Sequence, residues 1–513
     1  MFDALSARAK TPSTFLARVS SSGPSSLAAC ALLCALFPVL LAVTLLAAAA
    51  AVVYGNIRKC CLGKAQRQPV NLLDGLPSSG PKGPTHGPTD EGEQLDVIVL
   101  GATGLVGGHI LSYLTTRHPN LRVGIAGRTH AKLAAVRAQK GEPHQRIIVA
   151  DAADVRALFA MCAQTRVLLT TVGPFKRYGN LVYHACAHSG THYVDITGES
   201  DWVSRMGAIY NAVAVRSGAS MVSFGGVDSV PSDVGTFLAC EKFRNEHPRA
   251  GPVRGVEVVV TRFKGGAPAG TIETVAGAVD GTDRLQLPVG GKAALQALPA
   301  MPRNADTNIV DLFKPFARAV HLKYWTVPFF MGHTNSRTVR RTNAILGHAP
   351  DLRYSERMGF ASFTQALTYL LGACVALPWI YFAPLREILR RVGALPKANA
   401  GASAVSEEIC VRGSVSFSFA AYGEDSRGNT VISTVRFSGM GDPGVAHTAV
   451  CQSEIAVLLA SREIDPRPGC VTPVAAVGAE RLKEALVGTG LVWVDAPPAH
   501  CCVRTLSEGK KIS

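Results

Sequence analysis

A glycine-rich turn constrains the fold of this chain more than any other feature. The stretch "DVIVLGATGLVGGHILSYL" (96–114) places an apolar run, three glycines and a helical pattern in direct succession. Gly101 would end a strand, Gly104 would let the backbone approach a pyrophosphate, and Gly107 would let the helix pack against the sheet. The first N–H groups of that helix would hold the phosphates, because the helix dipole favours anions there. The predicted dinucleotide turn comprises Gly101, Ala102, Thr103, Gly104, Leu105, Val106 and Gly107.

The sequence around this turn repeats one pattern, in which short β-branched runs alternate with amphipathic helical stretches. The runs are apolar throughout, which is typical of a parallel sheet covered on both faces. The alternation therefore predicts an α/β fold, a Rossmann-type doubly wound parallel sheet, over residues 95–240. The expected strands cover 96–100, 122–127, 146–151, 166–172, 192–197 and 220–225.

The ends of these strands supply further candidates for the nucleotide site. Arg128 follows the second strand, where an acidic residue would bind the ribose of NAD and a basic one accommodates the 2′-phosphate of NADP. Arg128 thus favours NADP(H) over NAD(H), unless it is only a solvated surface arginine. Asp151 would approach the adenine side, and the segment closing the fourth strand would face the nicotinamide ribose; its residues are Thr171, Val172, Gly173 and Pro174.

Candidates for the chemistry follow the fourth, fifth and sixth strands. Tyr178 is the expected proton donor by residue type, and Lys176 could bind a phosphate or a carboxylate. None of the 11 tyrosines has a lysine four residues later, so the catalytic pair of short-chain reductases is missing. Three acidic residues would face the substrate, although each could instead cap a turn or a helix: Asp195, Glu199 and Asp228, the last with Asp233 as a fellow cap. No metal site is expected, because the cysteines lack paired metal spacing and no carboxylate or Cys completes a site with His184 and His188.

Changes in composition along the 513-residue chain indicate the boundaries of its other segments. A Pro/Gly/Ser-rich linker precedes the turn, and a second α/β domain is expected beyond residue 240. In that domain 254–264 and 410–438 would share a sheet, the latter as a hairpin across "EDSRGN". The predicted organisation is a polar basic N-terminus (1–25), a transmembrane anchor (26–55), the linker (56–94), the NADP-binding domain (95–240), the second domain (241–485) and a tail (486–513).

Two apolar runs point to a membrane. Residues 26–55 exceed the roughly 20 residues that span a bilayer, and a cleaved signal peptide is the alternative. A second run at 358–385 also lacks charge. A full crossing there would place the two parts of the expected second sheet on opposite sides of the bilayer. We therefore expect this run to dip into one leaflet or to shield a lipid site, with a full span as the alternative.

The net charge of +15 is spread along the chain without a dense block, and no nucleic-acid-binding motif accompanies it. A basic protein with a membrane segment is better explained by attraction to anionic lipid, so nucleic acid is not expected as a partner. The expected location is intracellular, at a lipid-droplet, mitochondrial or endoplasmic-reticulum membrane. A homodimer is a further expectation.

Several motifs together resemble the saccharopine dehydrogenase-like oxidoreductases, including the trans-acting enoyl reductases of lipid assembly. They cover most of residues 95–485; the most specific are "VGPFKRYG" and "YVDITGE", joined by "VIVLGATGLVGG", "SFGGVDSVPSDVGTFLA", "GGAPAGTIET", "VRRTNAIL" and "GDPGVAHTAV". The resemblance implies a Rossmann domain with a second α/β domain inserted in it. The segment "LPKANAGASAVSEE" departs from the family pattern, which puts any role of that segment in doubt.

These observations predict a membrane-attached, NADP(H)-dependent oxidoreductase that acts on a small-molecule or lipid-linked carbonyl or enoyl group. One alternative is a catalytically inactive Rossmann-fold protein at a lipid surface. Another is a saccharopine dehydrogenase proper, although a soluble amino-acid substrate would not require a membrane anchor.

Overall fold

The computed structural model describes residues 94–265, 314–381, 383–391 and 413–495. These residues fall into two compact units. The larger, spanning 68–367 and 396–495, holds two seven-stranded sheets. The smaller includes Thr368–Leu395, and therefore the end of α13 (Phe363–Tyr381) and all of α14 (Ala383–Arg391).

The first sheet is entirely parallel and has the strand order β13-β6-β5-β4-β1-β2-β3. This confirms the predicted doubly wound α/β fold. The fifth and sixth strands end earlier than expected, because the carboxylate of Asp195 binds the backbone N–H groups of Thr197 and Phe224 just beyond them. The strands are β1 (Leu95–Leu100), β2 (Val123–Gly127), β3 (Ile147–Val149), β4 (Thr165–Thr170), β5 (His192–Val194), β6 (Ser220–Val222) and β13 (Gly469–Val471).

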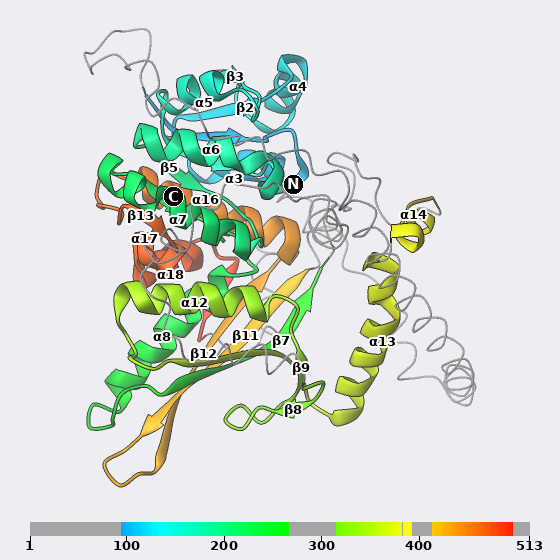
Figure 1. Cartoon of the computed structure of the whole chain (residues 1–513), viewed down its shortest axis with the longest axis vertical. Helices are drawn as coiled ribbons and strands as arrows, with labels where there is room; N and C mark the ends of the chain where they lie inside the picture. The colour runs from blue at the N-terminus through cyan, green and yellow to red at the C-terminus, as the bar shows by residue number, and fades with distance from the viewer. Residues whose placement is uncertain (1–93, 266–313, 382, 392–412, 496–513) are drawn as a thin grey trace, which may run out of the picture. The chain divides into compact units, whose positions relative to one another are not determined.

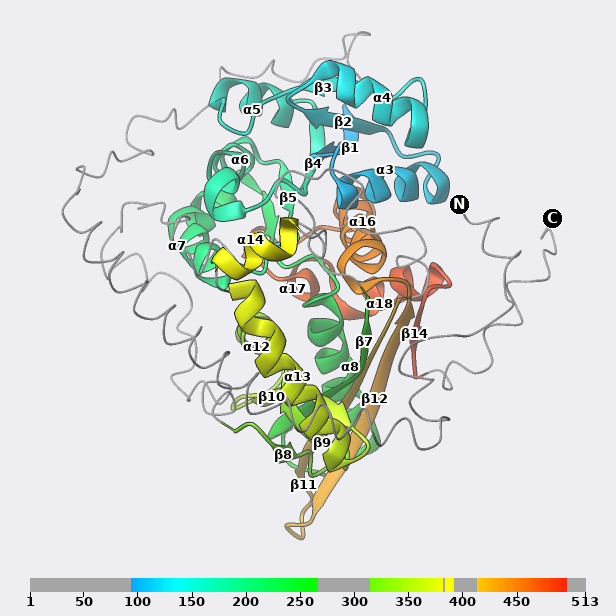
Figure 2. The ribbon, with the colours of Figure 1, turned by 90° about the vertical axis from the view of Figure 1, so that its right-hand side faces the viewer.

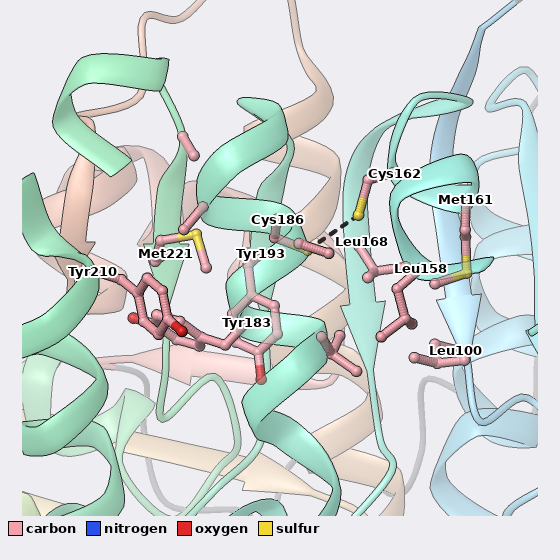
Figure 3. Packing of buried hydrophobic residues seen from close by; sticks show 14 of the residues in the cluster. Leu100, Leu158, Met161, Cys162, Leu168, Tyr183, Cys186, Tyr193, Tyr210 and Met221 are labelled. Carbon is pink, nitrogen blue, oxygen red and sulfur yellow. Dashed lines mark hydrogen bonds between the residues drawn. The ribbon is translucent and has the colours of Figure 1, made fainter. Parts of the chain in front are cut away.

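Helices cover both faces of this sheet (Figures 1 and 2). One face carries α3 (Leu105–Arg117), α4 (His130–Lys140) and α16 (Thr448–Ala460). The other carries α5 (Val155–Cys162), α6 (Phe175–Ser189) and α7 (Ser200–Ser217). Figure 3 shows the core beneath this second group, where Tyr183, Tyr193 and Tyr210 gather beside Met221. The burial of both faces explains why the strands read as continuous apolar runs.

The chain returns to the first sheet after building most of the second. β13 pairs with β6, and the side-chain amide of Gln452 on α16 donates to the carbonyl oxygens of Thr170 (3.0 Å) and Val194 (3.2 Å). The range 241–485, expected to form one second domain, therefore contributes to both sheets.

The second sheet has the order β14-β12-β11-β7-β10-β9-β8 and is antiparallel except where β10 pairs with β7. The predicted hairpin is confirmed as β11 and β12, and β7 lies beside it as expected. α8 (Val230–Glu246) packs on β11 and β12, where the missing side chain of Gly235 leaves room for Phe419. The strands are β7 (Gly255–Lys264), β8 (Ala317–Arg318), β9 (Trp325–Pro328), β10 (Arg353–Phe360), β11 (Ser414–Glu424), β12 (Thr430–Met440) and β14 (Val492–Val494); the remaining helices are α12 (Gly332–Leu346), η2 (Pro443–His447), α17 (Pro473–Val477) and α18 (Ala479–Gly488).

The structure describes most of only one of the two predicted membrane segments. Residues 26–55 lie outside the described part of the chain. The run 358–385 is not one element, because its first three residues end β10 and the helical part begins only at Phe363. Within the described ranges, no helix has both the length and the apolar character that a membrane crossing requires.

Candidate functional site

The glycine turn joins β1 to α3 in a conformation that requires glycine. Gly101 has φ +93°, a value that side chains rarely tolerate, and its carbonyl oxygen accepts the N–H of Gly104 at 2.9 Å. A Cβ on Gly107 would lie 2.8 Å from the carbonyl carbon of Gly101, so only glycine lets α3 approach the turn this closely. The first and third predicted roles, ending the strand and packing the helix, therefore have a steric basis.

The middle glycine leaves space for a ligand. A Cβ on Gly104 would meet one atom among the described residues, the Gly101 oxygen at 3.2 Å. Gly104 is also the N-cap residue of α3 and, as a glycine, it offers no side-chain cap to the first N–H groups of that helix. Free helix N–H groups beside open space suit the phosphates of a dinucleotide. The N–H groups of Leu105 and Val106 would hold these phosphates, since the Gly104 N–H already binds the Gly101 oxygen.

The other predicted cofactor residues lie at the same edge of the sheet, because the carboxyl ends of parallel strands meet there. Thr171 follows β4, and its hydroxyl donates to the Gly101 oxygen at 3.3 Å. Arg128 follows β2 and is exposed, with no hydrogen bond or ion pair to any described residue. Asp151 follows β3 and is also exposed; its carboxylate accepts the N–H of Ala153 at 2.9 Å. Val172, Gly173 and Pro174 complete the loop into α6, with a cis bond before the proline.

The two predicted catalytic residues lie in the first turn of α6. The Nζ of Lys176 is 2.9 Å from the carboxylate of Asp201 on α7, so this lysine already has a partner. The ring of Tyr178 lies under the guanidinium of Arg177, 5.1 Å from its centre. No hydrogen bond of the Tyr178 hydroxyl is found within the described residues.

Glu199 and Asp195 hold loops in place. The two carboxylate oxygens of Glu199 accept the N–H groups of Phe175 (2.9 Å) and Lys176 (2.8 Å), which caps the start of α6 from a distant position. Asp195 is fully buried, and burial raises its pKa to about 7. Its four hydrogen bonds come from two backbone N–H groups and the hydroxyls of Tyr193 (2.8 Å) and Ser223 (3.1 Å). Both residues therefore have the structural roles that were the alternative in the sequence.

Asp228 differs from the other two acids. It follows β6 and keeps partial solvent contact, and no hydrogen bond to its carboxylate is found in the described ranges. Burial of the carboxyl, and next the charge of Asp442, raise its pKa to about 6. A carboxyl of this kind can release a proton near neutral pH.

Contacts connect Asp442, whose charge acts on Asp228, to the glycine turn. Asp442 caps η2 by accepting the N–H of Val445 at 2.8 Å. Val445 in turn packs against Leu105 and Val106, the first residues of α3. The π-helical turn η2 therefore lies between the predicted phosphate site and the two carboxylates. Such turns are common at functional sites.

A buried network of polar side chains holds the backbone of Asp228 in place. The side-chain amide of Asn335 on α12 donates to the Asp228 carbonyl (2.6 Å) and to the Glu356 carboxylate (3.0 Å). The N-cap residue of α8 is Ser229, without a side-chain cap, so Asp228 and Asp233 do not cap this helix as the alternative had it. Asp233 instead accepts the hydroxyl of Thr342 at 2.5 Å and the N–H of Val474 at 3.0 Å.

Sequence reasoning missed Asp442, Asn335 and Glu356. Asp442 precedes Pro443-Gly444, a pattern that indicates a capped turn and could have been found. Asn335 and Glu356 have no such signal, because their partners are distant in the sequence. No cluster of three or more His, Cys, Asp or Glu side chains within the described ranges could hold a metal ion.

Comparisons with known proteins identify the family and the cofactor of this chain. The family model of the saccharopine dehydrogenase NADP binding domain matches residues 97–216, which confirms NADP as the expected cofactor. A Mycobacterium tuberculosis protein named as a trans-acting enoyl reductase is 32% identical over 425 residues, covering 78% of this chain and 96% of the relative. The trans-acting enoyl reductase of Mycobacterium leprae is 28% identical over 424 residues, with 78% and 97% coverage.

A solved structure is similar at lower identity. The apo saccharopine dehydrogenase (L-Glu forming) of Saccharomyces cerevisiae has a TM-score of 0.44 and 15% identity, covering 78% of this chain and 99% of that one. The sequence match to the mycobacterial protein at 32% identity, over nearly its whole length, establishes the relationship. The chain belongs to the saccharopine dehydrogenase-like family of NADP-binding oxidoreductases that includes the trans-acting enoyl reductases.

Proposed function

We propose that this protein is an NADPH-dependent reductase of a carbonyl or enoyl group on a lipid or lipid-linked substrate, and that it works at a membrane surface. One observation carries the proposal: the Asp228 carboxyl, with a pKa of about 6, feels the charge of Asp442, which caps the turn η2 that packs against the residues after the glycine turn. NADPH bound at the turn would supply a hydride. The residues of the chain must then supply binding, orientation and a proton.

Asp228 is the proposed proton donor. Reduction of an enoyl group adds a hydride to one carbon and a proton to the other, so a protonated group must stand near the substrate. Lys176 is less suited as a donor, since it is already paired with Asp201. Tyr178, whose ring lies under the Arg177 guanidinium, stays the competing candidate. Asn335 holds the Asp228 backbone, which makes it a positioning residue.

Two segments support the membrane part of the proposal. Residues 26–55 are long and apolar enough to span a bilayer. In the smaller unit, α14 exposes Ile388 and ends in Arg390 and Arg391, an apolar and basic combination that suits an anionic lipid surface, whereas Arg386 is buried. Lipid droplets and the mitochondrial or endoplasmic-reticulum membranes are candidate locations, and a homodimer is a separate prediction for light scattering to test.

The test uses the full-length chain in detergent. Titration with NADPH and NADH, followed by cofactor fluorescence, should show tighter binding of NADPH. NADPH oxidation is then measured with enoyl lipids, with lipid extracts and with saccharopine as parallel substrates. Turnover of lipid alone supports the proposal, and turnover of saccharopine supports a saccharopine dehydrogenase. NADPH binding without turnover of any substrate would indicate a non-catalytic protein. Failure of the wild-type chain to bind NADPH would contradict the proposed reductase function.

A further inference from the structure

A pocket lies apart from the glycine turn, between α7, α12 and the end of β13. Its lining includes Ser200 and Ser204 of α7, Arg337 and Arg341 of α12, and Thr472. None of the residues predicted to bind the nucleotide lines it. The pocket is therefore a separate feature of the larger unit.

The charge of this pocket is positive and unbalanced. Two guanidinium groups line it, one helical turn apart, and no acidic side chain does. Within the described ranges neither arginine forms an ion pair. Arg337 donates to the Ser200 hydroxyl at 3.0 Å, and Arg341 donates to the Cys470 carbonyl oxygen. A guanidinium carries five N–H donors, so each group has donors left for a ligand.

Neighbouring acids are already engaged. Asp201, next to Ser200 on α7, is 2.9 Å from Lys176 and 3.8 Å from Arg205. Asp233 accepts hydrogen bonds from Thr342 and Val474. Buried or half-buried charges are usually paired with an opposite charge. No carboxylate in the described part of the chain neutralises the two guanidinium groups.

The remaining wall of the pocket is apolar. Val203, Met221, Phe224 and Val471 contribute it, and Figure 3 shows Met221 near the Tyr210 and Tyr183 side chains of the core. A ligand that fits both parts has an oxyanion at one end and an apolar body at the other. We propose that this pocket binds the carboxylate or phosphate group of a small amphipathic molecule, with Arg337 and Arg341 as the anion-binding residues.

The proposal does not rest on the proposed reductase function, and the experiment keeps the two apart. Isothermal titration of the full-length protein uses inorganic phosphate, hexanoate and the uncharged 1-hexanol. Hexanoate should bind, phosphate should compete with it, and hexanol should not bind. Arg337→Gln and Arg341→Gln should each weaken hexanoate binding about tenfold or more, the usual effect of losing a charge-assisted hydrogen bond.

A matched control and a second variant complete the test. Arg216→Gln removes an exposed charge at the end of α7 outside the pocket and should leave hexanoate binding unchanged. Ser204→Glu, at an exposed position on the pocket wall, should abolish binding by supplying a carboxylate of its own, even if an arginine variant fails to fold. NADPH titrations of the same samples should not change.

Three results would overturn the assignment. Hexanoate and phosphate could both fail to bind the wild-type protein. Hexanol could bind as well as hexanoate. Arg216→Gln could weaken hexanoate binding as much as the pocket variants, which would attribute binding to the general positive charge.

Discussion

A side chain on Gly107 would collide with the carbonyl group of Gly101, six residues earlier in the chain. Gly107→Ala should therefore push α3 away from the turn and weaken NADPH binding about tenfold, while overpacking lowers stability by about 1–3 kcal/mol. Gly108→Ala is the matched control, because its nearest neighbour is the flexible end of Lys140, at 3.3 Å. Fluorescence titration and thermal unfolding of both variants measure the effects, and equal losses in the two would argue against the steric role of Gly107.

Arg128 should set the choice of cofactor. Arg128→Asp replaces the expected partner of the 2′-phosphate with a repelling charge, so NADPH should bind about tenfold or more weakly while NADH keeps its affinity. The control Arg216→Asp changes net charge equally at an exposed site on α7. Parallel titrations with the two nucleotides decide the matter. Tighter binding of NADH than of NADPH by the wild-type chain would refute the role given to Arg128.

Asp228 should impose a pH dependence on turnover. A proton donor acts in its protonated form, and with a pKa of about 6 the protonated share falls as pH rises through that value. We expect kcat/KM for NADPH-dependent reduction to drop about tenfold per pH unit above about pH 6. Asp228→Asn should lower the rate and remove this limb of the profile. An unchanged profile would show that another group supplies the proton, whereas the exposed control Asp465→Asn should behave as wild type.

Lys176 and Tyr178 can be tested as the competing proton donors. The ion pair between Lys176 and Asp201 is partly exposed, so Lys176→Met should cost less than about 1 kcal/mol of stability. If Asp228 is the donor, Lys176→Met and Tyr178→Phe should each keep kcat within about threefold of wild type. A loss of a hundredfold or more with Tyr178→Phe would transfer the role to that tyrosine.

Asp195 should make stability fall as pH rises. Its pKa in the folded protein is about 7, above the usual value of 3.8, so between about pH 4 and 7 the folded state holds a proton that the unfolded chain has lost. That difference lowers the free energy of unfolding by at most about 1.4 kcal/mol per pH unit. The effect is complete above pH 7. Asp195→Asn should flatten this slope in denaturant titrations from pH 5 to 8, and a parallel curve for the variant would contradict the assignment.

Sequence patterns predicted those elements whose structure depends on residues close together in the chain. The strands between Val97 and Val222 could be predicted from their apolar sequences, because both faces of their sheet are buried. The β11–β12 hairpin could be predicted because polar turn residues separate two β-branched runs. The glycine turn was predicted since its steric demands act within seven residues. The rule that ligands meet the carboxyl ends of parallel strands led to the prediction that Arg128 and Asp151 bind the cofactor, and the structure has both residues at that edge of the sheet.

Long-range partners could not be predicted in this way. β13 has only three residues, and nothing in "GCV" indicates that it extends a sheet begun hundreds of residues earlier. Glu199 looks like a substrate residue until its contact with the start of α6 is known. The polar network of Asn335 and Glu356 likewise depends on elements that lie apart in the sequence.

The late return of α16 and β13 has a consequence for biosynthesis. A nascent chain that has emerged as far as Val222 carries six of the seven strands of the first sheet. It still lacks the Gln452 amide that binds the carbonyl oxygens of Thr170 and Val194. The part of that face over β4 and β5, which α3 and α4 do not cover, must therefore stay exposed while more than two hundred further residues are translated. Exposed apolar strands of this kind are prone to aggregation during synthesis.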